Sequence, residues 1–175
     1  MKKMLLPFTQ CVDMDAIEDA VRLAKSHNAV LVPLSLMYVS EKSWKKGPRL
    51  EQVQQSKDFL EAVRCKAAKY GVQTQRFEVT TSNVTESINL LNQELGCDAV
   101  QVFVRPRGTV LLQAREIKDL LEQSICKLYI VYPQREDVPG GIAGFMQRIG
   151  LGARKQKPSL YDGMTPQESF VAQLP

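Results

Sequence analysis

Long apolar stretches are missing from this sequence of 175 residues. No run of about 18 apolar residues occurs anywhere, so the sequence predicts no membrane-spanning helix. The apolar residues that follow Met1-Lys2-Lys3 end at Thr9 and are too few for the apolar part of a signal peptide. We therefore expect a cytoplasmic protein, and the 44% hydrophobic and 24% charged residues are ordinary for a globular domain.

Residues for metal and redox chemistry are also scarce. The sequence contains one histidine and four cysteines, and no two cysteines form a Cys-x-x-Cys pair: Cys11, Cys65, Cys97 and Cys126. Neither a zinc site nor a dithiol redox site follows from this spacing, and we expect no metal and reduced thiols. We interpret the single histidine, His27, as a residue at the end of a helix.

The excess of positive charge is small. Lysine and arginine exceed the acids by +4, which falls short of the dense basic surface of a dedicated nucleic-acid binder. One local exception is the segment 40–48, in which Lys42, Lys45 and Lys46 flank the only tryptophan, Trp44. We expect a charged surface loop there and no specific nucleic-acid partner, with RNA or DNA binding through Trp44 as a weaker hypothesis.

Apolar runs alternate with helical periodicity along most of the chain. The predicted strands are residues 4–8, 29–39, 72–79, 99–104 and 128–132, and the predicted helices are residues 15–27, 50–70, 85–95 and 111–125. Strict alternation predicts an α/β fold of the Rossmann-like kind, with a five-stranded parallel sheet sandwiched by helices. Pro33 lies inside the second strand, so we expect a bulge or an edge position there.

Ligand sites in such folds lie at the carboxyl ends of the strands. The loops 9–13, 40–48 and 105–109 follow predicted strands and are the candidate site segments. Asp13 and Asp15 precede a helix, and we interpret them as helix caps.

Several short segments together resemble the universal stress protein family over residues 3–133. They are Leu5-Leu6-Pro7-Phe8, Ala20-Val21-Arg22-Leu23-Ala24-Lys25, Ala29-Val30-Leu31, Tyr70-Gly71-Val72, Leu95-Gly96-Cys97-Asp98-Ala99 and Ser124-Ile125-Cys126-Lys127-Leu128. The resemblance implies the fold of the adenine nucleotide hydrolase-like proteins, a stress-response or regulatory function, and a homodimer formed through the last strand. In that strand the expected interface residues are Leu128, Tyr129, Ile130 and Tyr132.

The nucleotide motif of the resembled family is degenerate in this chain. Family members that hold ATP place an aspartate after the first strand and a Gly-x2-Gly-x9-Gly-Ser/Thr signature after the fourth. Thr9 stands in place of the aspartate, and only Gly108 matches a signature glycine. Arginine at 105 crowds the approach that glycine allows, and proline at 106 lacks an amide donor. Asp119 stands at the Ser/Thr position and would bring negative charge toward phosphates.

We therefore expect no catalytic residues and no cofactor. The main hypothesis is a non-catalytic regulatory or scaffolding protein. The alternative is an adenine-nucleotide binder or slow ATPase with a modified phosphate loop, which would use Thr9, Gln10, Arg105, Arg107 and Gly108.

A C-terminal extension, residues 134–175, follows the predicted domain of residues 1–133. Four apolar residues in it have helical spacing, Ile142, Phe145, Met146 and Ile149, and basic residues follow, among them Arg154 and Lys155. We expect this extension to dock on an unidentified protein partner or on an anionic membrane surface, which would place the protein at the periphery of a membrane complex. Packing on its own domain, or disorder, is the alternative.

Overall fold

The helices begin and end at residues whose local chemistry suits those positions. The computed structural model describes residues 1–105, 108–123, 125–132 and 171–173. The Asp13 carboxylate accepts hydrogen bonds from the backbone amides of Asp15 and Ala16 at the start of α1 (Met14–Ser26). Asn83 caps α3 (Val84–Glu94) through the amide of Glu86. Gly71, with a left-handed φ of 68°, ends the long helix α2 (Leu50–Tyr70).

Five parallel strands form the sheet, as predicted. They are β1 (Lys2–Phe8), β2 (Ala29–Tyr38), β3 (Phe77–Thr81), β4 (Ala99–Arg105) and β6 (Leu128–Val131). Their order is β3-β2-β1-β4-β6, with parallel pairing throughout. The chain first moves outward from β1 to β3 and then returns through α3 to the other side of β1. The strand order therefore reverses between β1 and β4.

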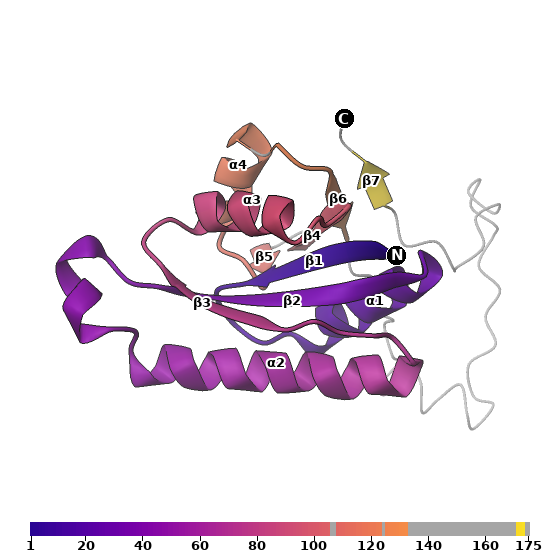
Figure 1. Ribbon diagram of the computed structural model, residues 1–175, viewed down its shortest axis with the longest axis horizontal. Coiled ribbons are helices and arrows are strands. Elements are labelled where there is room, and N and C mark those ends of the chain that lie inside the picture. The colour runs from indigo at the N-terminus through magenta and orange to yellow at the C-terminus, as the bar shows by residue number, and fades with distance from the viewer. Residues whose placement is uncertain (106–107, 124, 133–170, 174–175) are drawn as a thin grey trace, which may run out of the picture. The chain divides into compact units, whose positions relative to one another are not determined.

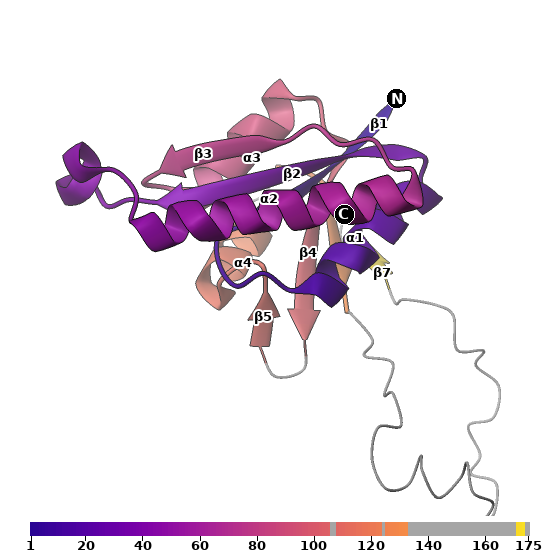
Figure 2. The same ribbon diagram turned by 90° about the horizontal axis from the view of Figure 1, so that it is seen from below.

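The two faces of the sheet carry separate apolar cores. Met4, Leu6 and Phe8 of β1 pack with α1 and α2, and the Phe8 and Phe59 rings stack with their centroids 4.2 Å apart. Leu5 points to the opposite face, where α3 and α4 (Ala114–Gln123) cover the sheet. Figure 1 shows these two pairs of helices on opposite faces, and Figure 2 shows α2 running along β2. Both cores follow from the two-residue alternation of side chains along a strand.

Pro33 is accommodated in an inner strand, and the expectation of a bulge or an edge position was wrong. β2 lies between β1 and β3. Leu31 exchanges hydrogen bonds with the backbone of Gln73 and Gln75, and the regular ladder to β3 starts only at Leu34. Residues two apart in a strand direct their backbone groups to the same side, so Pro33, like Leu31, faces β3. Proline has no amide to donate, and at Pro33 the ladder between β2 and β3 is interrupted, so no hydrogen bond is lost there.

Two short antiparallel strands were not predicted. β5 (Gly108–Val110) pairs antiparallel with the end of β4, where the sequence had predicted an open loop. The following helix consequently starts at Ala114, and Leu111 and Leu112 are buried before it begins. The other strand, β7 (Val171–Gln173), pairs with the outer edge of β6.

The compact unit therefore includes more than the predicted domain. Residues 171–173 join the sheet of residues 1–132 through β7, while residues 133–170 and 174–175 lie outside the described residues. A short 3-10 helix, η1 (Glu41–Lys46), occupies the predicted loop between β2 and α2. Within the described ranges no helix is long and apolar enough to cross a membrane.

Candidate functional site

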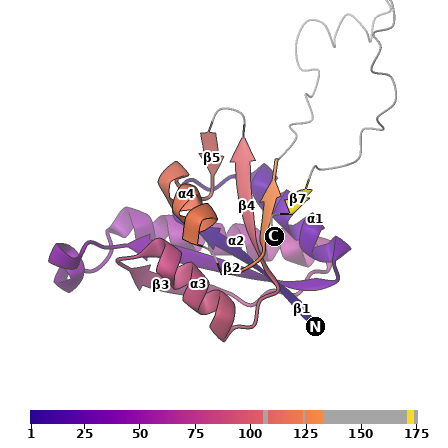
Figure 3. The ribbon, with the colours of Figure 1, turned by 90° about the horizontal axis from the view of Figure 1, so that it is seen from above.

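Backbone hydrogen bonds join the segment after β1 to the segment after β5, the short strand that pairs with the end of β4. β1 and β4 themselves pair only at Met4–Ala99 and Leu5–Val100. Beyond that point β5 lies beside β4, on the side opposite to β6 (Figure 3). The amides of Thr9 and Gln10 both donate to the Leu111 carbonyl oxygen, at 2.8 and 3.1 Å. Two backbone donors at the switch point of the sheet, where a ligand is usually bound, are thus already used.

A carboxylate occupies the start of the helix that follows β5. Glu116 accepts a hydrogen bond from the Thr9 hydroxyl at 2.5 Å and another from the Gln113 amide at 2.7 Å, both on Oε2. Gln10 donates from Nε2 to the Leu112 carbonyl oxygen at 3.1 Å. A helix N-terminus favours an anion, and here the side chain of Glu116 supplies it. The same position suits the phosphate group of a ligand, so Glu116 would compete with one.

The one described arginine of this edge is also paired within the chain. Arg105 makes two short contacts with Asp13, at 2.8 and 3.0 Å, and a longer one of 3.6 Å with Asp15. Its side chain is 23% exposed, and its buried Nε has no hydrogen-bond partner among the described residues. The described part of this edge thus has one positive charge, on Arg105, and three carboxylates, those of Asp13, Asp15 and Glu116. The described side chains of the edge therefore carry a net negative charge, which disfavours phosphate.

The structure brings four of the five predicted nucleotide-site residues to one edge. Thr9, Gln10 and Arg105 lie there through the contacts given above, and the Gly108 backbone pairs with Arg105 where β5 joins β4. Arg107 lies outside the described residues. Asp119 is not the acid of this edge, because it lies within α4 and contacts Arg115 at 3.8 Å.

The residue that sequence reasoning missed is Glu116. A signal for it was present, because Gln113 and Glu116 have the spacing of a capping box in front of an apolar helical face. The pairing of β5 with β4 also had a signal. A proline and a glycine stand between the short β-type runs 102–104 and 109–110, which is typical of a tight turn.

The predicted interface strand is partly covered. Leu128 is buried, Tyr129 and Ile130 are half-buried, and Tyr132 is exposed. The outer backbone edge of β6 is paired with β7 of the same chain. The homodimer stays a prediction. The predicted docking residues lie outside the described residues: Ile142, Phe145, Met146, Ile149, Arg154 and Lys155.

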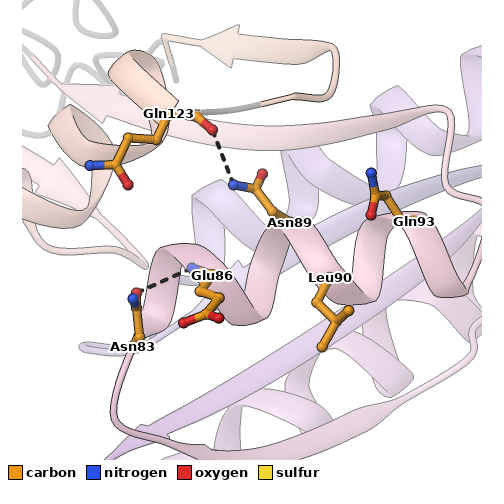
Figure 4. A pocket seen from close by; sticks show the side chains of 6 residues that line it. All are labelled: Asn83, Glu86, Asn89, Leu90, Gln93 and Gln123. Atoms are coloured by element: carbon orange, nitrogen blue, oxygen red, sulfur yellow. Dashed lines mark hydrogen bonds between the residues drawn. The ribbon is translucent and has the colours of Figure 1, made fainter.

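Two surface hollows of the described domain lie away from this edge. One of about 400 Å³ lies along α3 and reaches the end of α4 (Figure 4). Its side chains are mostly amides, and the Asn89 Nδ2 donates to the Gln123 carbonyl oxygen at 3.2 Å, which ties α3 to α4. A second hollow, of about 230 Å³, lies at the opposite ends of the strands between Lys2 and Lys127. No metal-ligating cluster occurs in the part of the chain that the structure describes.

Comparison with known proteins identifies the family. Among solved structures, a universal stress protein from Archaeoglobus fulgidus superposes with a TM-score of 0.58 at 11% identity, covering 74% of this chain and 97% of the other. A universal stress protein of the same organism in complex with dAMP gives 0.56 at 10% identity, covering 74% and 96%. A family protein from Arabidopsis thaliana with AMP bound gives 0.54 at 15% identity, covering 82% and 99%.

These likenesses establish the fold, since their sequence identities are low. No curated protein matches the chain in sequence. The model of the universal stress protein family, in contrast, matches residues 1–131, which is most of the chain. This protein therefore belongs to the universal stress protein family.

Proposed function

We propose that this protein is a non-catalytic regulatory member of the universal stress protein family, which acts by binding other proteins. The observation that carries the proposal is the occupied switch point. The Glu116 carboxylate takes the start of α4, and Arg105 is neutralised by Asp13. Among the described residues of this edge, the Thr9 and Gln10 amides are already hydrogen-bonded and the side chains carry a net negative charge, which disfavours a phosphate group.

Admission of a nucleotide phosphate would require several contacts to break together. Glu116 would have to leave both Thr9 and Gln113, and Arg105 would have to exchange the Asp13 carboxylate for the ligand. Asp13 would then keep only its hydrogen bonds to the start of α1. Each new hydrogen bond to the ligand would replace an existing charge-assisted hydrogen bond within the protein, so the net free energy gained on binding is small.

Adenine-nucleotide binding is the second candidate, and the solved relatives favour it over the first. Two of the structures described above contain dAMP or AMP. In this chain the guanidinium of Arg105 would rotate from Asp13 to a phosphate, with Arg107, two residues further along the sequence, assisting. A single phosphate is the smallest charge that the edge would need to accommodate, so AMP is the better ligand to test alongside ATP.

Thermal unfolding with millimolar AMP or ATP separates the two candidates. Ligand stabilisation follows RT ln(1 + [L]/Kd), so a closed site gives almost no change in melting temperature. A shift of several degrees that is lost in Arg107→Ala would establish nucleotide binding and overturn the first proposal. Glu116→Gln, which removes the competing charge, should then increase the shift, and Glu122→Gln on the exposed side of the same helix serves as the matched control.

The regulatory proposal includes a homodimer and a docking role for the C-terminal extension. Substitution of Phe145 and Ile149 by glutamate in the full chain removes the predicted apolar contact without shortening the protein. We expect the doubly substituted chain to stay folded and to lose the proteins or membrane fraction that co-purify with the native chain. Unchanged co-purification would mean that the extension does not carry the partner contact.

A further inference from the structure

The connection between β2 and α2 projects from the domain as a separate tip, here defined as residues 38–50. In Figure 1 it is the indigo-violet turn that extends beyond the end of β2, away from the helices that cover the sheet. Within it, η1 has no buried residue. Apart from Val39, which is buried beside the end of β2, the tip contributes no buried side chain to either core.

Three large apolar side chains lie on this tip. Tyr38 and Trp44 are each 51% exposed, and Leu50 is 83% exposed. Single exposed apolar residues are ordinary on protein surfaces, but three within thirteen residues of one projection form a local concentration. Trp44 is also the only tryptophan of the chain.

The cations of the tip have no acidic partner. Lys42, Lys45, Lys46 and Arg49 are exposed, and none of them forms an ion pair within the described ranges. In the rest of the domain, arginines such as Arg22 and Arg64 are paired with glutamates on their own helices. The tip thus combines unpaired positive charge with exposed aromatic surface.

We propose that this tip binds the surface of an anionic lipid bilayer, with Trp44 and Leu50 entering the interfacial region and the four cations contacting lipid phosphates. Tryptophan beside lysine is the composition of interfacial anchors, because the indole ring favours the headgroup region and the ammonium groups are attracted to anionic lipid. The convex form fits a deformable bilayer, whereas a rigid protein surface would need a groove of matching shape.

The base of the tip is held in place by the domain. Gln52 Nε2 donates to the Tyr38 carbonyl oxygen at 3.1 Å, and the Arg49 amide donates to Gln52 Oε1 at 3.0 Å. The Val39 amide also donates to the Thr81 carbonyl oxygen at 2.8 Å. Because both ends of the tip are fixed, docking orders little additional chain, and this preserves affinity.

Trp44 makes the proposal directly measurable in the full chain. We expect vesicles of phosphatidylcholine containing phosphatidylglycerol to shift the tryptophan emission to shorter wavelength, and brominated lipid to quench it, while pure phosphatidylcholine has a much smaller effect. Lys45→Glu with Lys46→Glu should reduce binding at least about tenfold, since each lysine near an anionic surface contributes on the order of 1 kcal/mol. Trp44→Ala should reduce co-sedimentation with the same vesicles.

Matched variants assign the effect to the tip. Lys57→Glu with Arg76→Glu reverses two cations outside it and should leave binding unchanged. Arg154→Glu with Lys155→Glu tests the extension, and loss of binding in that variant alone would overturn the proposal. An unchanged emission spectrum with anionic vesicles, or equal binding by the Lys45/Lys46 variant and the native chain, would also overturn it.

Discussion

At the scale of single residues, Asp13 has two tasks. Its Oδ1 caps α1 by accepting the amides of Asp15 and Ala16, and its carboxylate also binds Arg105 of β4. The first task was predicted from position in the sequence, because an aspartate before an apolar helical pattern is a typical cap. The second depends on where β4 places Arg105, and the local sequence around Asp13 gives no information about that.

Replacement of Asp13 separates its two tasks. Asp13→Ala should lower the free energy of unfolding by about 1–3 kcal/mol, since a lost cap costs about 1 kcal/mol and Arg105 would be left partly buried without its partner. Asp13→Asn retains the cap oxygen and should cost less. Urea unfolding measures both. Asp15→Ala, at a side chain that is 67% exposed, is the control, and an equal loss there would contradict this account.

Glu18 predicts a defined dependence on pH. Hydrogen bonds from Lys66 and then Tyr70 lower the pKa of Glu18 from 4.5 to about 2, and these partners tie α1 to α2. Because the pKa is lower in the folded state, the stabilisation is fully present above pH 4.5 and is lost as the pH falls through about 2. Glu18→Gln should therefore be less stable than the native chain at pH 7 and should lose less stability on acidification.

The control for this prediction is another glutamate. Arg64 lowers the pKa of Glu61 to about 2 as well, but both side chains are about half exposed, so water and salt screen the pair. Urea midpoints between pH 7 and pH 2 should change much less for Glu61→Gln than for Glu18→Gln. Equal changes in the two variants would show that Glu18 is not a special contact between helices.

At the scale of elements, the helices and parallel strands were largely predictable, because each has its own periodicity and its own end residues. α2 occurs at its predicted bounds, with Leu50 at the start and Gly71 after the end. The short antiparallel strands were not predictable with the same ease. β5 has three residues, and the apolar residues 111 and 112 after it were read as part of the helix.

The candidate site was predicted in part for the same reason. Thr9 follows β1 and Arg105 is the last residue of β4, and the carboxyl ends of parallel strands lie at one edge of the sheet. The state of that edge depends on Glu116, whose contact with Thr9 spans 107 positions in the sequence. Local pattern indicates which residues gather at an edge, but not which of them will bind one another.

The packing of α2 against the sheet depends on one ring. Phe59 is fully buried and stacks on Phe8 with an angle of 5° between the ring planes. Phe59→Ala should lower the free energy of unfolding by about 3–5 kcal/mol, since it removes an aromatic ring from a packed core. Leu50→Ala lies on the same helix at 83% exposure and should change it by less than about 0.5 kcal/mol. Chemical denaturation of both variants tests the contrast.

At the scale of the whole molecule, one strand edge has two candidate occupants. β7 pairs with β6 through Tyr129–Gln173, Ile130–Ala172 and Val131–Val171. The homodimer proposed above would use the same edge of β6. An unpaired edge strand readily adds another strand, so the chain's own segment and a second copy compete for it.

Removal of residues 170–175 should consequently increase self-association. We expect light scattering at tens of micromolar to show a larger dimer fraction for the shortened chain than for the full chain. Tyr129→Lys in the shortened chain should reverse the increase by placing like charges close together. A dimer fraction that is unaffected by the deletion would locate any interface away from this edge.

The central position of β1 also has a consequence for the order of events during synthesis. β1 is made before the other strands of the sheet, yet its neighbour β4 pairs with it only at Ala99 and Val100, about a hundred residues later. At translation rates of roughly 5–20 residues per second, that edge waits several seconds for its partner. A nascent chain that has reached only α3 therefore carries an unpaired, strongly apolar strand, and the interval before β4 emerges is the one in which a chaperone is most useful to it.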